Sequence, residues 1–177
     1  WGMEQYVRDA RINMIYEGTN GIQSLDLLGR KVLGNQGASL QKFGKLIGKL
    51  VAQEMGNEAM AEFTKPLADL GQKMTQFTTE IGMKAMGNAD EVGAASVDYL
   101  RVVGHLVFAY FWARMAQVAL AQIAKAQDAA QRPDPIYAAK LQTARFYFAR
   151  LLPETAGLIR SARSGSEVLM DTDAALA

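Results

Sequence analysis

One glutamate stands in a segment whose composition suits chemistry on a bound ligand. Residues 14–23 read MIYEGTNGIQ, so Glu17 follows an apolar run and precedes a Gly-Thr turn. Apolar neighbours would withdraw water from the Glu17 carboxylate and raise its pKa toward the range useful to a general base. Gly18 lets the backbone approach a ligand closely. Glu17 is therefore a candidate base, and the alternative is a solvated turn residue, because motifs this short recur by chance.

The residues after Gly18 predict the start of a helix. Asn20 is a good N-cap and Gln23 follows three residues later, as in a capping box, so we expect a helix from there to about Leu33. A helix N-terminus directs N–H groups and the positive end of its dipole outwards, which suits a phosphate or carbonyl oxygen. The opening at Thr19–Asn20 is thus placed to meet such a group beside Glu17.

The elements that must position this segment are all helical. Residues 2–11 read as the end of a short helix, and residues 34–39 (GNQGAS) form a loop that we take as a domain boundary. We therefore divide the chain into residues 1–35 and residues 36–177, with a frayed tail at the C-terminus. The predicted fold class is all-α: an antiparallel four-helix bundle preceded by the last helices of another domain.

Apolar spacing of three and four residues locates the bundle helices. The first helix contains Leu40, Phe43, Ile47 and Leu50, and the second contains Phe63, Leu67, Leu70, Met74, Phe77 and Ile81. The third runs from about Ala89 to Gln131, and because it is apolar on most sides we expect it to be central. Asp134 should cap the fourth helix, with Pro135 at its first position, and Pro153 should kink or interrupt that helix.

Composition and charge exclude several classes of function. The 177 residues include 19 Lys and Arg against 18 Asp and Glu, a net charge of +1, which offers no footprint for nucleic acid. Cysteine is absent and His105 is the single histidine, so Cys-type zinc sites are excluded and a His-based metal site is very unfavourable. The most apolar run, residues 102–113, is shorter than the ~20 residues of a membrane span. We expect a cytoplasmic protein without a membrane span, and a chain that is a fragment of a longer one.

Other conspicuous side chains have simpler explanations. We expect His105 to be buried or partly buried, because its neighbours are apolar. The lysines of residues 42–49, at spacings of three and four, should form a solvated face, with an anion contact as the weaker alternative. Methionines and aromatic residues at helical spacing usually belong to the core. We assign to the core Met83, Met86, Phe108, Tyr110, Phe111 and Trp112.

Residues 6–31, YVRDARINMIYEGTNGIQSLDLLGRK, resemble the C-terminal signature of the flavin-dependent acyl-CoA dehydrogenases. The shared residues are Arg8-Asp9, then Ile15-Tyr16-Glu17-Gly18-Thr19 and Ile22-Gln23. The later segment ARFYFARLLPETAGLI, residues 144–159, looks like part of the extra C-terminal helical domain of a long subfamily. That subfamily includes 3-methylthiopropanoyl-CoA dehydrogenase-like enzymes. The resemblance places residues 1–35 at the end of the dehydrogenase helical domain and the appended bundle after them.

This resemblance implies roles for particular residues. Glu17 would be the catalytic base that removes the α-proton of an acyl-CoA, while the β-hydrogen leaves as hydride to the flavin N5. Gly18 would line the substrate site, and Thr19, Asn20 and Gly21 would contact FAD. The implied partners are an acyl-CoA, an electron-transfer flavoprotein or similar acceptor, and further copies of the chain in a homo-oligomer.

The sequence departs from the family pattern at one place, because Ser24 and Leu25 stand where many members have a basic residue. Most of the FAD and CoA site would lie upstream of Trp1, so residues 1–177 alone should be inactive. The alternative is a non-enzymatic helical interaction or oligomerisation module. In that case Glu17 would be solvated or paired with Arg8 or Arg11.

Overall fold

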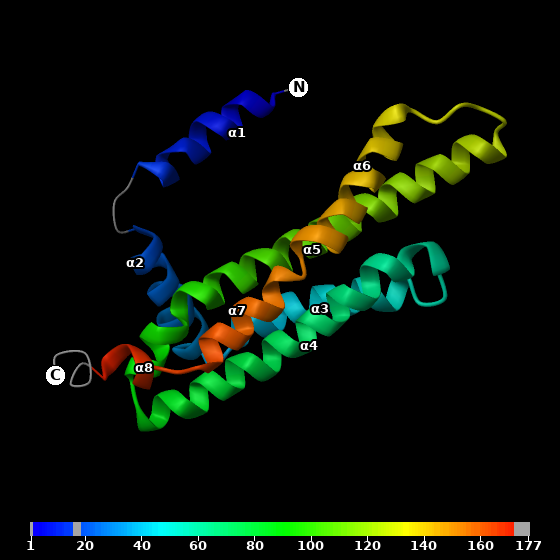
Figure 1. Cartoon of the computed structure of the whole chain (residues 1–177). Coiled ribbons are helices and arrows are strands. Elements are labelled where there is room, and N and C mark those ends of the chain that lie inside the picture. Colours follow the sequence, from blue (N-terminus) through cyan, green and yellow to red (C-terminus); the bar gives the residue numbers. More distant parts are fainter. Residues whose placement is uncertain (1, 16–18, 172–177) are drawn as a thin grey trace.

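The computed structural model describes residues 2–15 and 19–171, and these residues form helices and no strand (Figure 1). The all-α prediction is thus confirmed for the described part of the chain. Before the bundle lie α1 (Met3–Ala10), the 3-10 helix η1 (Arg11–Met14), α2 (Thr19–Leu25) and the π-helix η2 (Asp26–Leu33). The bundle contains α3 (Ala38–Gln53), α4 (Glu58–Gly87), α5 (Asp90–Asp128), α6 (Pro135–Phe146), the π-helix η3 (Tyr147–Leu151) and α7 (Glu154–Arg163), and the short α8 (Glu167–Met170) follows.

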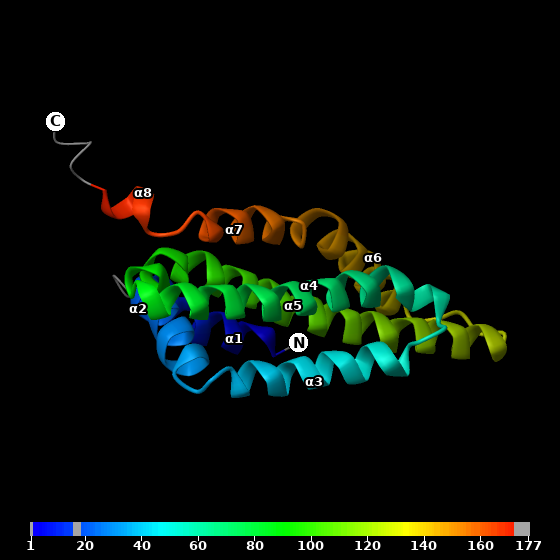
Figure 2. The ribbon, with the colours of Figure 1, turned by 90° about the horizontal axis from the view of Figure 1, so that it is seen from below.

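The bundle is antiparallel, as predicted, because short connections join successive long helices. Helices α4 and α5 lie between α3 on one side and the α6–α7 pair on the other (Figure 2). Helices α6, η3 and α7 follow one another closely and together take the place of the predicted fourth helix; we call them the fourth arm of the bundle. The two helices that precede the bundle in the sequence, α2 and η2, pack against α5.

The apolar spacing of α4 correctly predicts which face enters the core. Six side chains that recur every three or four residues are at most 3 % exposed: Phe63, Leu67, Leu70, Met74, Phe77 and Ile81. Phe63 meets Phe148 of η3 edge to face, with ring centroids 5.3 Å apart. Full burial of each large apolar side chain contributes about 1.5–3 kcal/mol, so this row is a main source of bundle stability.

Helix α5 is the central element, as its composition predicts. It packs against α2, η2, α4, α6 and α7. Among the described residues it is also the one helix long and apolar enough to cross a membrane by length and composition. A core helix of a globular protein has the same composition, and α5 buries one face among these neighbours.

The start and the interruption of the fourth arm agree with the sequence. Asp134 accepts a hydrogen bond from the Ile136 N–H at 2.9 Å, and Pro135 is the first residue of α6. The arm changes to a π-helix at Tyr147 and is interrupted at Pro153, which immediately precedes α7. Proline has no N–H to donate, so the break falls where the sequence predicted it.

Two expectations about local structure are wrong. Helix α2 begins at Thr19, so Asn20 is its second residue and not its N-cap. Four of the residues assigned to the core are exposed, namely Met83 (63 %), Met86 (83 %), Phe108 (60 %) and Phe111 (54 %). The other two agree better, since Tyr110 is buried and Trp112 is half-buried. Helical spacing identifies residues that share a face, but it does not show whether another element covers that face.

Candidate active-site segment and its supports

The candidate base lies between the two described parts of the chain. Glu17 and Gly18, with Tyr16, lie outside the residues that the structure describes, so their assigned roles stay predictions. The segment before them ends with η1 and Ile15, whose side chain is exposed. The segment after them is α2, which begins at Thr19. The chain therefore presents the candidate base directly before a helix.

Thr19, Asn20 and Gly21 form the first turn of α2. Thr19 is half-buried, while Asn20 and Gly21 are exposed. A Cβ built on Gly21 would meet no atom within 4 Å, so space is open beside this residue. The first turn of a helix directs its backbone N–H groups out along the axis. These three residues thus offer an accessible helix start next to the candidate base.

A buried serine fastens this turn to the bundle. The Ser24 side chain is fully buried, and its hydroxyl lies 2.7 Å from the carbonyl oxygen of Gly21. It also lies 3.2 Å from the hydroxyl of Ser96 in α5, which in turn donates to the carbonyl of Gly93 at 3.0 Å. Ser24 directly follows Gln23, and it is not a basic residue. In this chain the position therefore holds a buried contact with α5 and carries no charge.

The helix that continues from α2 is held by apolar and ionic contacts. Leu28 and Val32 of η2 are buried against the bundle core. Asp26 pairs with Lys31 at 2.8 Å and with Arg30 at 2.5 Å. The Lys31 hydrogen bond and the Arg30 guanidinium hold the pKa of the Asp26 carboxyl below its usual value. The first turn of α2 is consequently followed by a helix that is anchored to the core through Leu28 and Val32.

The part of the chain before the candidate base has no comparable support. Every described residue of α1 and η1 is exposed. Arg8 donates to the Gln5 side chain at 2.6 Å, and Gln5 donates to Asp9 at 2.7 Å. These hydrogen bonds lie along α1 itself. The two flanks of the Glu17 segment therefore differ, since one is braced by the bundle and the other is not.

A second polar cluster, which the sequence did not reveal, joins α5 to the fourth arm. His105 is partly buried, as predicted, with Nδ1 2.9 Å from the Tyr147 hydroxyl and Nε2 3.3 Å from a Glu154 oxygen. Tyr147 also donates to the backbone carbonyl of His105 at 3.1 Å, and Arg101 pairs with Glu154. Burial, reinforced by the negative charge of Glu154, raises the pKa of Tyr147 to about 12. The cluster ties both sides of the Pro153 interruption to α5.

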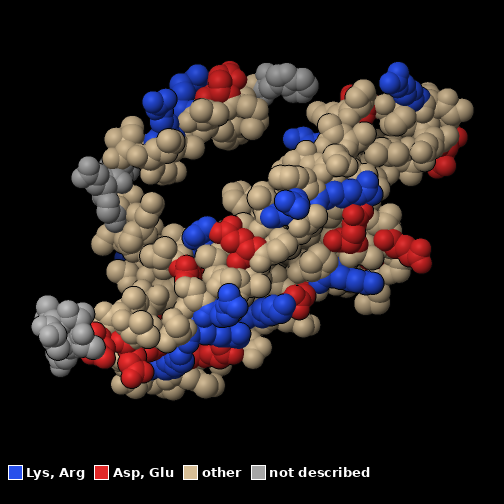
Figure 3. All heavy atoms as spheres, viewed as in Figure 1, with Lys and Arg blue, Asp and Glu red and all other residues tan. Residues whose placement is uncertain are grey.

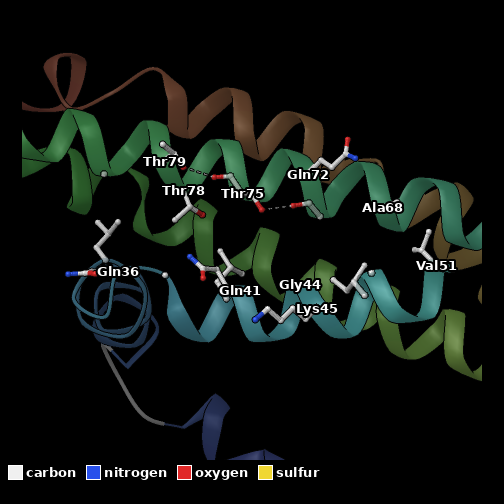
Figure 4. A pocket seen from close by; sticks show the side chains of 17 residues that line it. Gln36, Gln41, Gly44, Lys45, Val51, Ala68, Gln72, Thr75, Thr78 and Thr79 are labelled. Atoms are coloured by element: carbon white, nitrogen blue, oxygen red, sulfur yellow. Dashed lines mark hydrogen bonds between the residues drawn. The ribbon is translucent and has the colours of Figure 1, made fainter. Parts of the chain in front are cut away.

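A groove of about 740 Å³ runs between α3 and α4 (Figure 4). Its α4 wall carries hydroxyls that already bond within the helix: Thr75 donates to the Gly71 carbonyl and Thr79 to the Thr75 carbonyl, both at 3.1 Å. Lys45 lies at the groove, and Lys42 and Lys49 are exposed as predicted. No group of three or more potential metal ligands occurs among the described residues. Among the described residues that line the groove, Lys45 is the single charged one.

A family model and similar curated proteins point to the same family. A family model described as "Acetyl-CoA dehydrogenase C-terminal like" matches residues 43–173. The chain is 32 % identical over 174 residues to the broad-specificity linear acyl-CoA dehydrogenase FadE5 of Mycobacterium tuberculosis, covering 94 % of this chain and 27 % of that protein. It is also 32 % identical to the 3-methylmercaptopropionyl-CoA dehydrogenase of Ruegeria pomeroyi, over 86 % of this chain and 25 % of that protein.

A third relative is the butyryl-CoA dehydrogenase of Syntrophomonas wolfei, 25 % identical over 96 % of this chain and 28 % of that protein. The chain therefore spans about a quarter of the length of the curated relatives it matches. Because the family model covers most of the bundle and the signature precedes it, the chain belongs to the acyl-CoA dehydrogenase family, as a C-terminal helical part.

Proposed function

We propose that the whole protein is an FAD-dependent acyl-CoA dehydrogenase that converts an acyl-CoA thioester to the 2,3-enoyl-CoA. The observation that carries the proposal is the contiguous segment of residues 15–23, IYEGTNGIQ, at the start of a helix braced by the bundle. Family membership supports the class of reaction, and the names of the three relatives all specify acyl-CoA dehydrogenation. The particular acyl group is left open by those names.

In this proposal Glu17 is the base. Its carboxylate accepts the proton from the α-carbon of the acyl-CoA, and Gly18 lines the substrate site beside it. A bound FAD would supply the acceptor for the β-hydrogen, which would leave as hydride. Glu17 and Gly18 stand before the first turn of α2, so the base and the helix start reach the ligand site from one segment. A positioned general base contributes typically 10²–10⁴-fold to rate.

Thr19, Asn20 and Gly21 are proposed to contact FAD. The described residues suit such a contact in two respects. Asn20 and Gly21 are exposed at the end of a helix, where backbone N–H groups favour a phosphate or a carbonyl oxygen. The Ser24 hydroxyl holds the Gly21 carbonyl at 2.7 Å, which limits movement of the turn. The remaining contacts to the cofactor would come from other parts of the whole protein.

The partners in this proposal follow from the reaction. They are the acyl-CoA substrate, an electron-transfer flavoprotein or similar acceptor for the flavin electrons, and further copies of the chain in a homo-oligomer. We also propose a cytoplasmic location. Residues 1–177 alone are expected to be inactive, because they contain only a small part of the cofactor site.

The decisive experiment uses the full-length protein with its flavin. A panel of straight-chain acyl-CoAs is added without oxygen, and the flavin absorbance near its visible maximum is followed in the wild type and in Glu17→Gln. Bleaching in the wild type that is lost in Glu17→Gln, with flavin still bound, supports the assigned base and identifies the acyl class. Equal bleaching in both proteins would place the base elsewhere. A full-length protein that binds no flavin would leave the helical interaction module as the function.

A further inference from the structure

Helix α5 carries two apolar stripes on different faces. The first is buried and repeats every three or four residues: Ala95, Tyr99, Val102, Leu106, Ala109, Ala113 and Ala116. The second lies on another face of the helix and follows the same spacing from Gly104 onwards, with Val97 two turns earlier and Arg101 between them; we call it the outer stripe. It consists of Val97, Gly104, Phe108, Phe111, Met115 and Val118. Four of its side chains are more than half exposed: Val97, Phe108, Phe111 and Val118.

An exposed row of this kind differs from scattered surface apolar residues. Single exposed apolar side chains are common and need no explanation. Here the positions 104, 108, 111, 115 and 118 have the alternating spacing of four and three residues that characterises a seam between two helices. From residue 97 to residue 118 the row extends for about 32 Å at 1.5 Å per residue. Its geometry suits a helical partner of six turns or so.

The neighbouring elements leave much of this face of α5 exposed, although the Phe108 ring lies 6.4 Å, centroid to centroid, from the Tyr147 ring of η3. Helix α4 lies on one side of α5, and Figure 1 shows α1 across from α5, on the side away from α4. A hollow separates α1 from the bundle in the space-filling view (Figure 3). Helix α1 and η1 have their own exposed apolar residues: Met3, Tyr6, Val7, Ile12 and Met14. Helices α1 and α5 therefore lie on opposite sides of this hollow, and each carries exposed apolar residues.

We propose that the outer stripe of α5 is the docking surface for a helix from the part of the same polypeptide that precedes residue 1. The curated relatives are more than three times as long as this chain, and the matching family model is a C-terminal one. The preceding part of the polypeptide would join the chain at α1, on the side of the bundle where the outer stripe is exposed. The inference rests on family membership and does not depend on Glu17 being the base.

The charges beside the outer stripe favour a protein partner over a lipid surface. A helix that binds anionic lipid usually has a polar face rich in lysines and arginines, whose charges are available to the lipid headgroups. Here Arg101 is paired with Glu154, and Arg114 donates to the Tyr110 hydroxyl at 3.3 Å. Asp98 is also near, in the turn after Val97. The outer stripe is therefore apolar, and the arginines that border it already bind other side chains of the bundle.

Site-specific photo-crosslinking in the full-length protein tests the proposal. Phe111 is replaced by the photoreactive p-benzoyl-phenylalanine, which keeps an aromatic side chain at the same exposed position. After irradiation, we expect a product with the mass of one chain whose crosslinked peptide lies before residue 1. The same replacement at Phe108 should crosslink to the same preceding helix, because both residues share the outer stripe.

A matched control replaces Lys49, which is exposed on α3, and we expect it to yield no crosslink to that helix. Products with the mass of two chains would show that a second copy covers the stripe and would overturn the proposal. Absence of crosslinks at both phenylalanine positions would also overturn it. Flavin bleaching is measured on the same samples, so failure of the docking proposal and failure of the dehydrogenase proposal are distinguishable.

Discussion

The hydroxyls of Ser24 and Ser96 lie 3.2 Å apart in the interior, although 72 positions separate the two residues in the sequence. This contact joins the helix that follows the candidate base to the central helix of the bundle. The same Ser24 hydroxyl is 2.7 Å from the carbonyl of Gly21, a proposed FAD contact. The bundle therefore supports α2, the helix that follows Glu17, through this contact. This support is separate from the docking role proposed for the outer stripe of α5.

Replacing Ser24 with valine should loosen this support. The side chain is fully buried, so the larger group must displace its neighbours, and the Ser96 hydroxyl loses a partner. We expect a loss of about 1–3 kcal/mol in the free energy of unfolding, measured by urea titration. In the full-length protein, flavin affinity should fall as well.

The matched control is Ser161→Val, at an exposed position of α7. It should change the free energy of unfolding by less than Ser24→Val and leave flavin affinity unchanged. Equal effects of the two substitutions would mean that the Ser24 contact does not support the segment.

The pair formed by Glu91 and Ser166 predicts an acid-dependent loss of stability. Glu91 accepts from the Ser166 backbone N–H at 2.9 Å and from its hydroxyl at 2.8 Å, and these bonds lower the pKa of Glu91 below 4.5. A lowered pKa in the folded state means that stability is present above pH 4.5 and is lost as pH falls through the folded pKa. Wild type should therefore be more stable than Glu91→Gln at pH 7, and the difference should shrink below pH 4.5.

Urea titrations of both proteins at a series of pH values measure that difference. Glu167→Gln provides the control, because Glu167 is exposed and makes no side-chain hydrogen bond or ion pair among the described residues. A difference between wild type and Glu91→Gln that stays constant from pH 7 to pH 3 would contradict the prediction.

Two buried tyrosines should ionise late in an alkaline titration. Burial raises the pKa of Tyr99 to about 12, and burial with the charge of Glu154 does the same for Tyr147. Because the folded pKa is raised, stability should be intact below pH 10 and decline as pH rises from 10 toward 12. Absorbance at the phenolate band should show a late component, and each of Tyr99→Phe and Tyr147→Phe should remove part of it. A late component of unchanged size in both variants would contradict the assignment.

Two phenylalanines should respond differently to truncation. Phe63 is fully buried, while Phe108 is 60 % exposed. Phe63→Ala should reduce the free energy of unfolding by about 3–5 kcal/mol, because it removes buried apolar area and leaves a cavity. Phe108→Ala in the 177-residue chain should cost far less, since little buried area is lost there. Chemical denaturation of the two variants gives the comparison, and similar losses would show that the outer stripe is covered even in this chain.

The sequence predicted those parts of the fold that depend on local spacing. The row from Phe63 to Ile81, the Asp134–Pro135 start of α6 and the Pro153 interruption all follow from residues within a few turns of one another. The exposed Phe108 and Phe111 were assigned wrongly, because both faces of α5 are apolar and spacing cannot tell which face is covered. Contacts between distant residues left no local signal.

In the candidate site, too, local features could be predicted from the sequence and contacts between distant residues could not. The motif around Glu17 was visible in the sequence, but α2 begins at Thr19, before the N-cap that was predicted at Asn20. The Ser24–Ser96 contact could not be predicted, because a serine in a helix is usually exposed. Likewise, the apolar neighbours of His105 predicted partial burial, while its partners Tyr147 and Glu154 lie more than 40 positions away.

The contact between Ser24 and Ser96 also has a consequence for the order in which the protein is made. Synthesis proceeds from the N-terminus, so α2 leaves the ribosome well before α5 does. The serine that steadies the Gly21 turn must therefore wait for a partner encoded 72 codons later. A nascent chain that stops before α5 would carry the complete Glu17 motif without its brace. The contact that holds α2 against the bundle can consequently form only after α5 has been translated.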